Sequence, residues 1–214
     1  MPQKINLLIF DLDGTLIDSK RDIANAVHWT LRDLQLPQIS DEEVYAYVGN
    51  GVRPLILKSV GEHPEAYKKG LAIFKNYYQA HLLDHTVPFD GVVEVLKQFA
   101  AKKKAVFTNK PQQFTDPIIK GLKLDPYFDA VIGSDAGYPK KPDPAAIHHL
   151  LKKFDCPPDQ AVLIGDSKVD IETGKNAGIL TCGVTFGFRP AEEVRMAKPD
   201  FVAGNLPELV GFFA

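Results

Sequence analysis

The 214-residue sequence has few cysteines, little excess charge and no long apolar run. Its two cysteines, Cys156 and Cys182, are far apart and outside any metal-binding spacing, so a reducing cytoplasm is the expected compartment. A net charge of −2 without a basic stripe argues against a nucleic-acid polymer as partner. The apolar run at residues 5–10 is too short to span a membrane and ends at Asp11. We therefore expect neither a signal peptide nor a membrane segment.

The composition is that of an ordinary globular protein. Hydrophobic residues make up 45% and charged residues 24% of the chain, which predicts a sizeable buried core rather than disorder. The length suits either one large domain or a core domain that carries a smaller inserted one.

Short apolar runs recur along the chain, and amphipathic helical patterns separate the later ones. Each run is typical of a strand that is buried on both faces, and the alternation with helices predicts a parallel sheet. We therefore predict a three-layer, Rossmann-like α/β core. The runs lie at residues 5–10, 105–108, 130–133, 161–165 and 180–185.

The segment between the first two runs has a different residue pattern, with apolar residues at helical spacing and no convincing strand. Ser19 with Asp22, and Ser40 with Glu43, have the spacing of helix-capping boxes. This pattern predicts an all-helical insertion. The predicted domains are a helical cap at residues 16–83 and an α/β core at residues 1–15 and 84–214.

Pairs of aspartates follow two of the predicted strands. Asp11 and Asp13 come directly after the first run, and Asp166 with Asp170 follow the fourth. In open parallel sheets, ligands bind outside the carboxyl ends of the strands, so these carboxylates are candidates for a shared site. Local structure offers alternatives, because Asp-Gly is a hairpin signal and Asp166 or Ser167 would serve as a helix N-cap.

Two weaker signals complete a series. Thr108 and Asn109 end the second run, and Lys141 lies in a proline-containing loop before a predicted helix. Each alone is typical of a turn or a solvated loop. An aspartate pair, Thr-Asn, Lys and Gly-Asp-x-x-x-Asp, in this order, resemble the motif series of the haloacid dehalogenase superfamily. That family carries a helical cap after the first strand, which agrees with the insertion predicted above.

The resemblance implies a phosphatase that works through an aspartyl-phosphate. Asp11 would be the nucleophile, Asp13 the acid and then the base, and Lys141 the group that balances charge. An aspartate at position 13 disfavours dehalogenation, because family members that cleave carbon–halogen bonds generally lack it. The phosphate-binding residues would be Gly14, Thr108 and Asn109.

Several carboxylates that face a phosphate would repel it unless a cation lies between them. Ligands that are all oxygen point to Mg²⁺ as the cofactor. By resemblance, the ligands are the carboxylates of Asp11 and Asp166 and the backbone carbonyl of Asp13. Asp170 would act on the metal mainly through its contacts with other groups.

The predicted cap carries the candidate substrate loop. Gly49, Asn50 and Gly51 interrupt a helical pattern, and Arg53 would suit a small carboxylate, although an ordinary helix break with a surface arginine fits the same spacing. The segment resembles the Gly-x-Gly cap loop of phosphoglycolate phosphatases. The position of Arg189, after the fifth run, supports no specific role.

The leading expectation is hydrolysis of 2-phosphoglycolate to glycolate and phosphate. A β-phosphoglucomutase-like sugar phosphomutase, a pyrophosphatase or a sugar phosphatase on the same scaffold remain alternatives. A non-catalytic phosphate-binding protein is disfavoured, because every essential group is present. The expected partner is a small phosphate ester, without nucleic acid or membrane, and the expected assembly is a monomer or homodimer.

Overall fold

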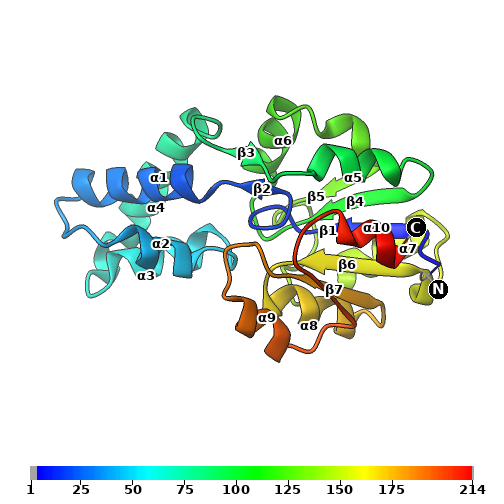
Figure 1. The fold of residues 1–214 in the computed structure, drawn as a ribbon. Coiled ribbons are helices and arrows are strands. Elements are labelled where there is room, and N and C mark those ends of the chain that lie inside the picture. The colour runs from blue at the N-terminus through cyan, green and yellow to red at the C-terminus, as the bar shows by residue number, and fades with distance from the viewer. Residues whose placement is uncertain (1–3, 214) are drawn as a thin grey trace.

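The computed structural model describes residues 4–213 and contains a six-stranded parallel sheet in the order β5-β4-β1-β6-β7-β8 (Figure 1). All five predicted runs form strands, which confirms the α/β prediction. The edge strand β8 was not predicted, although its three residues are all apolar; the run is as short as the other edge strand, β5. The strands are β1 (Leu7–Phe10), β4 (Lys103–Phe107), β5 (Ala130–Ile132), β6 (Ala161–Gly165), β7 (Leu180–Val184) and β8 (Phe201–Ala203).

The middle strand β1 explains why the sheet is so apolar. It pairs with β4 on one side and β6 on the other, and each of its residues is fully buried. Leu8 and Phe10 pack into one apolar cluster, with α5, α6 and α10, whereas Leu7 and Ile9 pack into a second cluster with α7. The helices are α5 (Val92–Gln98), α6 (Gln112–Gly121), α7 (Ala145–Lys153), α8 (Lys168–Asn176), α9 (Ala191–Met196) and α10 (Glu208–Phe213), with 3₁₀ turns at Asp125–Tyr127 and Pro158–Gln160.

A helical insert follows β1 and lies beyond one end of the sheet (Figure 1). We call helices α1–α4 the cap. A short antiparallel pair, β2 (Ile17–Asp18) with β3 (Val87–Pro88), joins the segments by which the chain enters and leaves the cap. The boundaries at 16 and 83 remain a prediction, and residues 1–3 and 214 of the predicted core lie outside the described residues. The cap helices are α1 (Lys20–Asp33), α2 (Asp41–Tyr47), α3 (Val52–Val60) and α4 (Tyr67–Ala80), with a 3₁₀ turn at Pro64–Ala66.

One of the two predicted capping boxes is present. The Ser40 side chain accepts from the backbone N–H of Glu43, and the Glu43 side chain accepts from the backbone N–H of Ser40. The box predicted for Ser19 and Asp22 is wrong, because Ser19 makes no side-chain cap bond. Asp22 instead accepts the Thr86 hydroxyl at 2.7 Å, from a residue 64 positions away. Tertiary partners have replaced the local ones.

Among residues 4–213, no helix combines the length and the apolarity that crossing a membrane requires.

Candidate active site

The carboxyl ends of the three middle strands place the candidate residues together. Asp11 directly follows β1, Thr108 follows β4, and Asp166 follows β6. Because β4, β1 and β6 are parallel neighbours, these three ends meet at one edge of the sheet. Lys141 reaches the same edge from the loop between β5 and α7.

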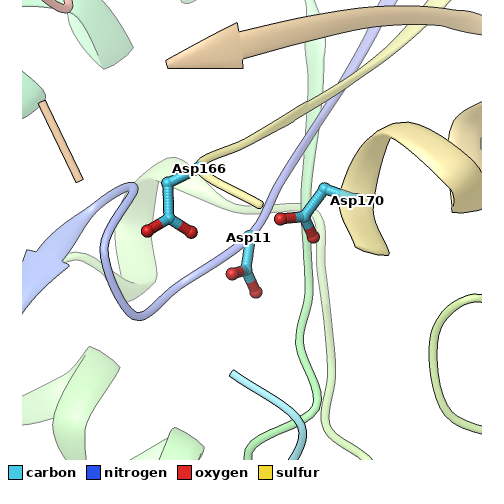
Figure 2. A group of neighbouring side chains, drawn as sticks. All are labelled: Asp11, Asp166 and Asp170. Carbon is cyan, nitrogen blue, oxygen red and sulfur yellow. The ribbon is translucent and has the colours of Figure 1, made fainter. Parts of the chain in front are cut away.

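Three carboxylates, from Asp11, Asp166 and Asp170, face one another at this edge (Figure 2). One oxygen from each lies within 4.8 Å of the others, and all three residues are buried. Asp170 comes from the first turn of α8, where Ser167 is the N-cap. The Ser167 hydroxyl donates to Asp170 Oδ2 at 2.6 Å, so the same residue starts the helix and orients the carboxylate.

In the part of the chain that the structure describes, one ammonium group pairs with this acidic cluster. Lys141 Nζ lies 2.8 Å from Asp11 Oδ1 and also forms an ion pair with Asp170. Burial acts to lower the pKa of Lys141, but the charges of the two aspartates together raise it above its ordinary value, so the lysine stays charged.

The cluster holds more negative charge than one lysine neutralises. Burial, reinforced by the charges of Asp170 and Asp11, raises the pKa of Asp166 to about 8. Burial also raises the pKa of Asp11 to about 6, although the Lys141 charge opposes this shift. Both shifts reflect burial and like charges that repel one another, and a cation held between these carboxylates would offset that repulsion.

Two glycines next to the cluster leave room for the carboxylates to lie close together. A Cβ atom at Gly14, whose φ is +85°, would lie 2.3 Å from Asp166 Oδ2, and one at Gly165 would lie 2.2 Å from Asp170 Cγ. Only glycine fits at these two positions. Three buried oxygen donors without nitrogen or sulfur form a set that fits Mg²⁺ or a similar hard cation.

Asp13 is held apart from this cluster by different partners. Lys110 Nζ donates to both of its carboxylate oxygens at 3.0 Å, and the Ser19 hydroxyl donates to Oδ1 at 2.5 Å. Lys110 Nζ also donates to the Tyr78 hydroxyl at 2.7 Å. Sequence reasoning missed Lys110 and Tyr78. The available signal was the lysine directly after Thr108 and Asn109, in a run that ends a buried strand.

A cavity lies between the strand ends and the cap. The core contributes polar groups to it, whereas the cap contributes mainly apolar side chains and the two predicted loop glycines. Lys110 is the one lysine or arginine in its described lining. The lining consists of Asp11, Asp13, Thr108, Asn109, Lys110 and Phe114 from the core, and of Ile23, Val48, Gly49, Gly51, Val52, Leu55, Phe74 and Tyr78 from the cap.

The predicted cap loop touches the core, but not with all of its residues. Asn109 Nδ2 donates to the Gly49 carbonyl at 3.3 Å, and Asn109 Oδ1 accepts the Lys141 backbone N–H at 2.9 Å. Asn50 lines a neighbouring hollow, together with Arg189. Arg53 is exposed and is absent from the cavity lining, so its predicted contact with substrate stays a prediction.

Arg189 has a contact that the sequence did not predict. Its guanidinium donates to the Ala46 carbonyl at 2.8 Å and to the Val48 carbonyl. Arg189 follows β7 in the core, and both carbonyls belong to the end of α2 and the loop after it. Arg189 therefore ties the core to the segment that leads into the cap loop.

Comparisons with known proteins agree with this geometry. A family model for haloacid dehalogenase-like hydrolases matches residues 8–184. A phosphoglycolate phosphatase from Vibrio parahaemolyticus is 37% identical, over 97% of this chain and 96% of its own length. One from Colwellia psychrerythraea is also 37% identical with the same coverage. The crystal structure of a predicted phosphoglycolate phosphatase from Haemophilus somnus superposes with a TM-score of 0.90 at 29% identity, covering 99% of this chain and 98% of that one.

Proposed function

Because the chain belongs to the haloacid dehalogenase-like hydrolase family and is a phosphatase of that family, we propose that it hydrolyses 2-phosphoglycolate through an aspartyl-phosphate on Asp11. The observation that carries the proposal is the position of Asp11. It is buried at the end of the central strand, 2.8 Å from Lys141, and it lines the cavity under the cap. Relatives that match over nearly the whole chain are named for this activity.

In the first step, a carboxylate oxygen of Asp11 attacks phosphorus, and the bond from phosphorus to the ester oxygen breaks. Asp13 gives its proton to the leaving alkoxide, which departs as glycolate. In the second step, Asp13 takes a proton from a water molecule that attacks the aspartyl-phosphate, which releases phosphate and restores Asp11.

The transferred group carries negative charge that the site must balance. Lys141 lies beside Asp11 and would neutralise part of it, while the Thr108 hydroxyl and the Asn109 backbone N–H would donate to the phosphoryl oxygens. Gly14 leaves room for this approach, since a side chain there would collide with Asp166.

We propose Mg²⁺ as the cofactor. Its ligands would be the carboxylates of Asp11 and Asp166 and the backbone carbonyl of Asp13, while Asp170 orients the site through Lys141 and Ser167. When bound, the ion would neutralise phosphoryl charge that the single lysine cannot.

The substrate assignment rests on the relatives and on the cavity. Apolar cap residues such as Val52 and Leu55 form much of the wall, which favours a small leaving group over a sugar. The proposed contact of Arg53 with the substrate carboxylate requires the cap loop or this side chain to turn inward, because Arg53 is exposed. We further propose that the enzyme acts in the cytoplasm as a monomer or homodimer, where the buried Cys156 and Cys182 would stay free thiols.

The test is phosphate release from 2-phosphoglycolate, several sugar phosphates and pyrophosphate, with Mg²⁺ or with EDTA. We expect Mg²⁺-dependent release that prefers 2-phosphoglycolate and is abolished in Asp11→Asn. Asp159→Asn is the matched control and should retain wild-type activity, because Asp159 is an exposed aspartate far from Asp11 in the sequence.

Each alternative outcome has a distinct meaning. Release that survives Asp11→Asn would contradict the nucleophile. A preference for pyrophosphate or a sugar phosphate would replace the substrate only, and conversion of a sugar phosphate to its isomer without free phosphate would identify a mutase.

A further inference from the structure

A buried lysine joins the cap to Asp13. Lys110 is 6% exposed, and its ammonium group makes hydrogen bonds to both Asp13 oxygens and to the hydroxyl of Tyr78. Tyr78 is 1% exposed and belongs to α4 of the cap, whereas Lys110 follows β4 of the core. Cap and core therefore meet through this ammonium group, next to the proposed acid–base residue.

The arrangement fixes the Asp13 carboxylate in one orientation. A buried ammonium ion is stable only when it is paired and fully hydrogen-bonded, and its three donors suit three acceptors. Lys110 satisfies this need with two oxygens of Asp13 and one of Tyr78, so rotation of the carboxylate would break a buried ion pair. Ser19 adds a further bond to Oδ1.

Tyr78 is held firmly enough to act as the cap-side anchor. Its ring stacks on Phe74 with centroids 5.4 Å apart and meets the Phe114 ring edge-on at 5.1 Å. The hydroxyl is therefore placed by packing, and its removal in Tyr78→Phe would leave that packing intact.

We propose that Lys110 and Tyr78 are positioning residues for Asp13, and that through them the placement of the acid–base carboxylate depends on contact between cap and core. The inference rests on the proposed function, since it assumes that Asp13 protonates the leaving group. Nothing in the chemistry requires Lys110 to touch the substrate.

Leaving-group chemistry distinguishes positioning from a merely structural role. An alkoxide such as that of glycolate needs a proton as it departs, whereas the acetate of acetyl phosphate is a weak base and does not. The two substrates are similar in size, but only 2-phosphoglycolate carries a carboxylate, so each variant is compared with the wild type on the same substrate. Loss of correctly placed Asp13 should therefore impair 2-phosphoglycolate far more than acetyl phosphate.

The experiment measures kcat/KM for both substrates in Asp13→Asn, Lys110→Met and Tyr78→Phe. We expect Asp13→Asn and Lys110→Met to lose roughly 100-fold or more on 2-phosphoglycolate and less than about 10-fold on acetyl phosphate. Tyr78→Phe should show the same selectivity with a smaller loss of about 5- to 10-fold, since one hydrogen bond is removed.

Lys104→Met is the matched control. Lys104 is also buried, but its ammonium donates only to the carbonyls of Phe99 and Lys102 in the described structure, away from the site. Its substitution should affect both substrates equally. If Lys110→Met fails to fold, Tyr78→Phe still decides, because it keeps the buried ring.

Three outcomes would overturn the inference. Equal losses on both substrates in Lys110→Met and Tyr78→Phe would make the pair structural. A higher KM for 2-phosphoglycolate alone, with kcat unchanged, would make Lys110 a contact for the substrate carboxylate. If Asp13→Asn itself shows no selectivity between the substrates, the proposed role of Asp13 fails first and the inference fails with it.

Discussion

Asp166 shows how single residues set the electrostatics of the site. It lies beside Asp11 and Asp170, while Lys141 is the one ammonium group that pairs with the described cluster. Burial and these like charges raise its pKa to about 8 from an ordinary value of 3.8. A carboxylate with a raised pKa holds a proton near neutral pH, and a metal must displace that proton to bind.

This shift predicts how stability depends on pH. The pKa of Asp166 is higher in the folded protein than in the unfolded chain. Its contribution to stability is therefore complete below the unfolded-state pKa of 3.8, and it is lost as the pH rises through the folded-state pKa of about 8. Each pH unit below that value should also weaken Mg²⁺ binding by about 1.4 kcal/mol. We therefore expect Mg²⁺ to raise Tm more at about pH 8.5 than at about pH 6.

Thermal unfolding with Mg²⁺ or EDTA at the two pH values measures this effect. Asp166→Asn is the control, because it removes both the titrating group and a ligand, and it should lose most of the Mg²⁺-dependent rise in Tm. An equal rise at both pH values would show that Asp166 does not titrate in this range.

At the scale of elements, two helices begin with the same device but serve different ends. Ser40 and Glu43 form the capping box of α2, and Ser167 and Asp170 form that of α8. Only the second box includes a carboxylate of the acidic cluster. The N-cap of α8 therefore links helix formation to the geometry of the active site.

The pair gives a matched test. Ser40→Ala and Ser167→Ala each remove an N-cap, so each should lower the unfolding free energy by about 1 kcal/mol and Tm by about 2 to 4 °C. Only Ser167→Ala should also lower kcat/KM, by about 10-fold, since one bond to Asp170 is lost. Similar activity in both variants would mean that Lys141 and the backbone N–H of Ser167 are enough to hold Asp170.

The strands and helix caps also show which features could be predicted from the sequence alone. The central strands were predictable because burial on both faces requires continuous apolar runs, and Asp11, Thr108 and Asp166 were found because each ends or follows such a run. The edge strand β8 offers a run of only three apolar residues, which is a weak signal. The false capping box at Ser19 shows the limit of local patterns, since a distant partner changes the outcome.

Contacts between distant segments were beyond sequence reasoning. Lys110 and Tyr78 are 32 positions apart, and no periodicity links a core loop to a cap helix. Arg53 was predicted from loop composition alone, which does not fix the direction of a side chain, and the structure leaves it exposed. Arg189 had no predicted role because its acceptors, backbone carbonyls 141 and 143 positions away, carry no sequence signature.

At the scale of the whole molecule, separate contacts hold the cap against the core around the cavity. They are the Arg189 bonds to the end of α2, the bond from Asn109 to Gly49, and the bond from Lys110 to Tyr78. Arg189 itself is absent from the cavity lining and reaches it only through the Val48 carbonyl, so its removal tests cap placement without removing a proposed catalytic group.

We expect Arg189→Ala to raise KM about 10-fold and to leave kcat within about 3-fold, because cap placement weakens by one or two charged hydrogen bonds. Arg189→Lys should restore only part of the affinity, since a point charge cannot reproduce the guanidinium fork. Arg195→Ala, at an exposed arginine of α9, is the control. Steady-state kinetics measure both constants, and an unchanged KM would assign no role to this tether.

The central claim is that the phosphoryl group passes through Asp11. The most direct measurement is rapid acid quench of the enzyme during turnover of ³²P-labelled 2-phosphoglycolate with Mg²⁺, followed by peptide mapping. The account predicts acid-stable, hydroxylamine-sensitive label on the peptide that contains Asp11, and no label in Asp11→Asn. Rapid turnover without labelled enzyme, or label on another residue, would contradict it.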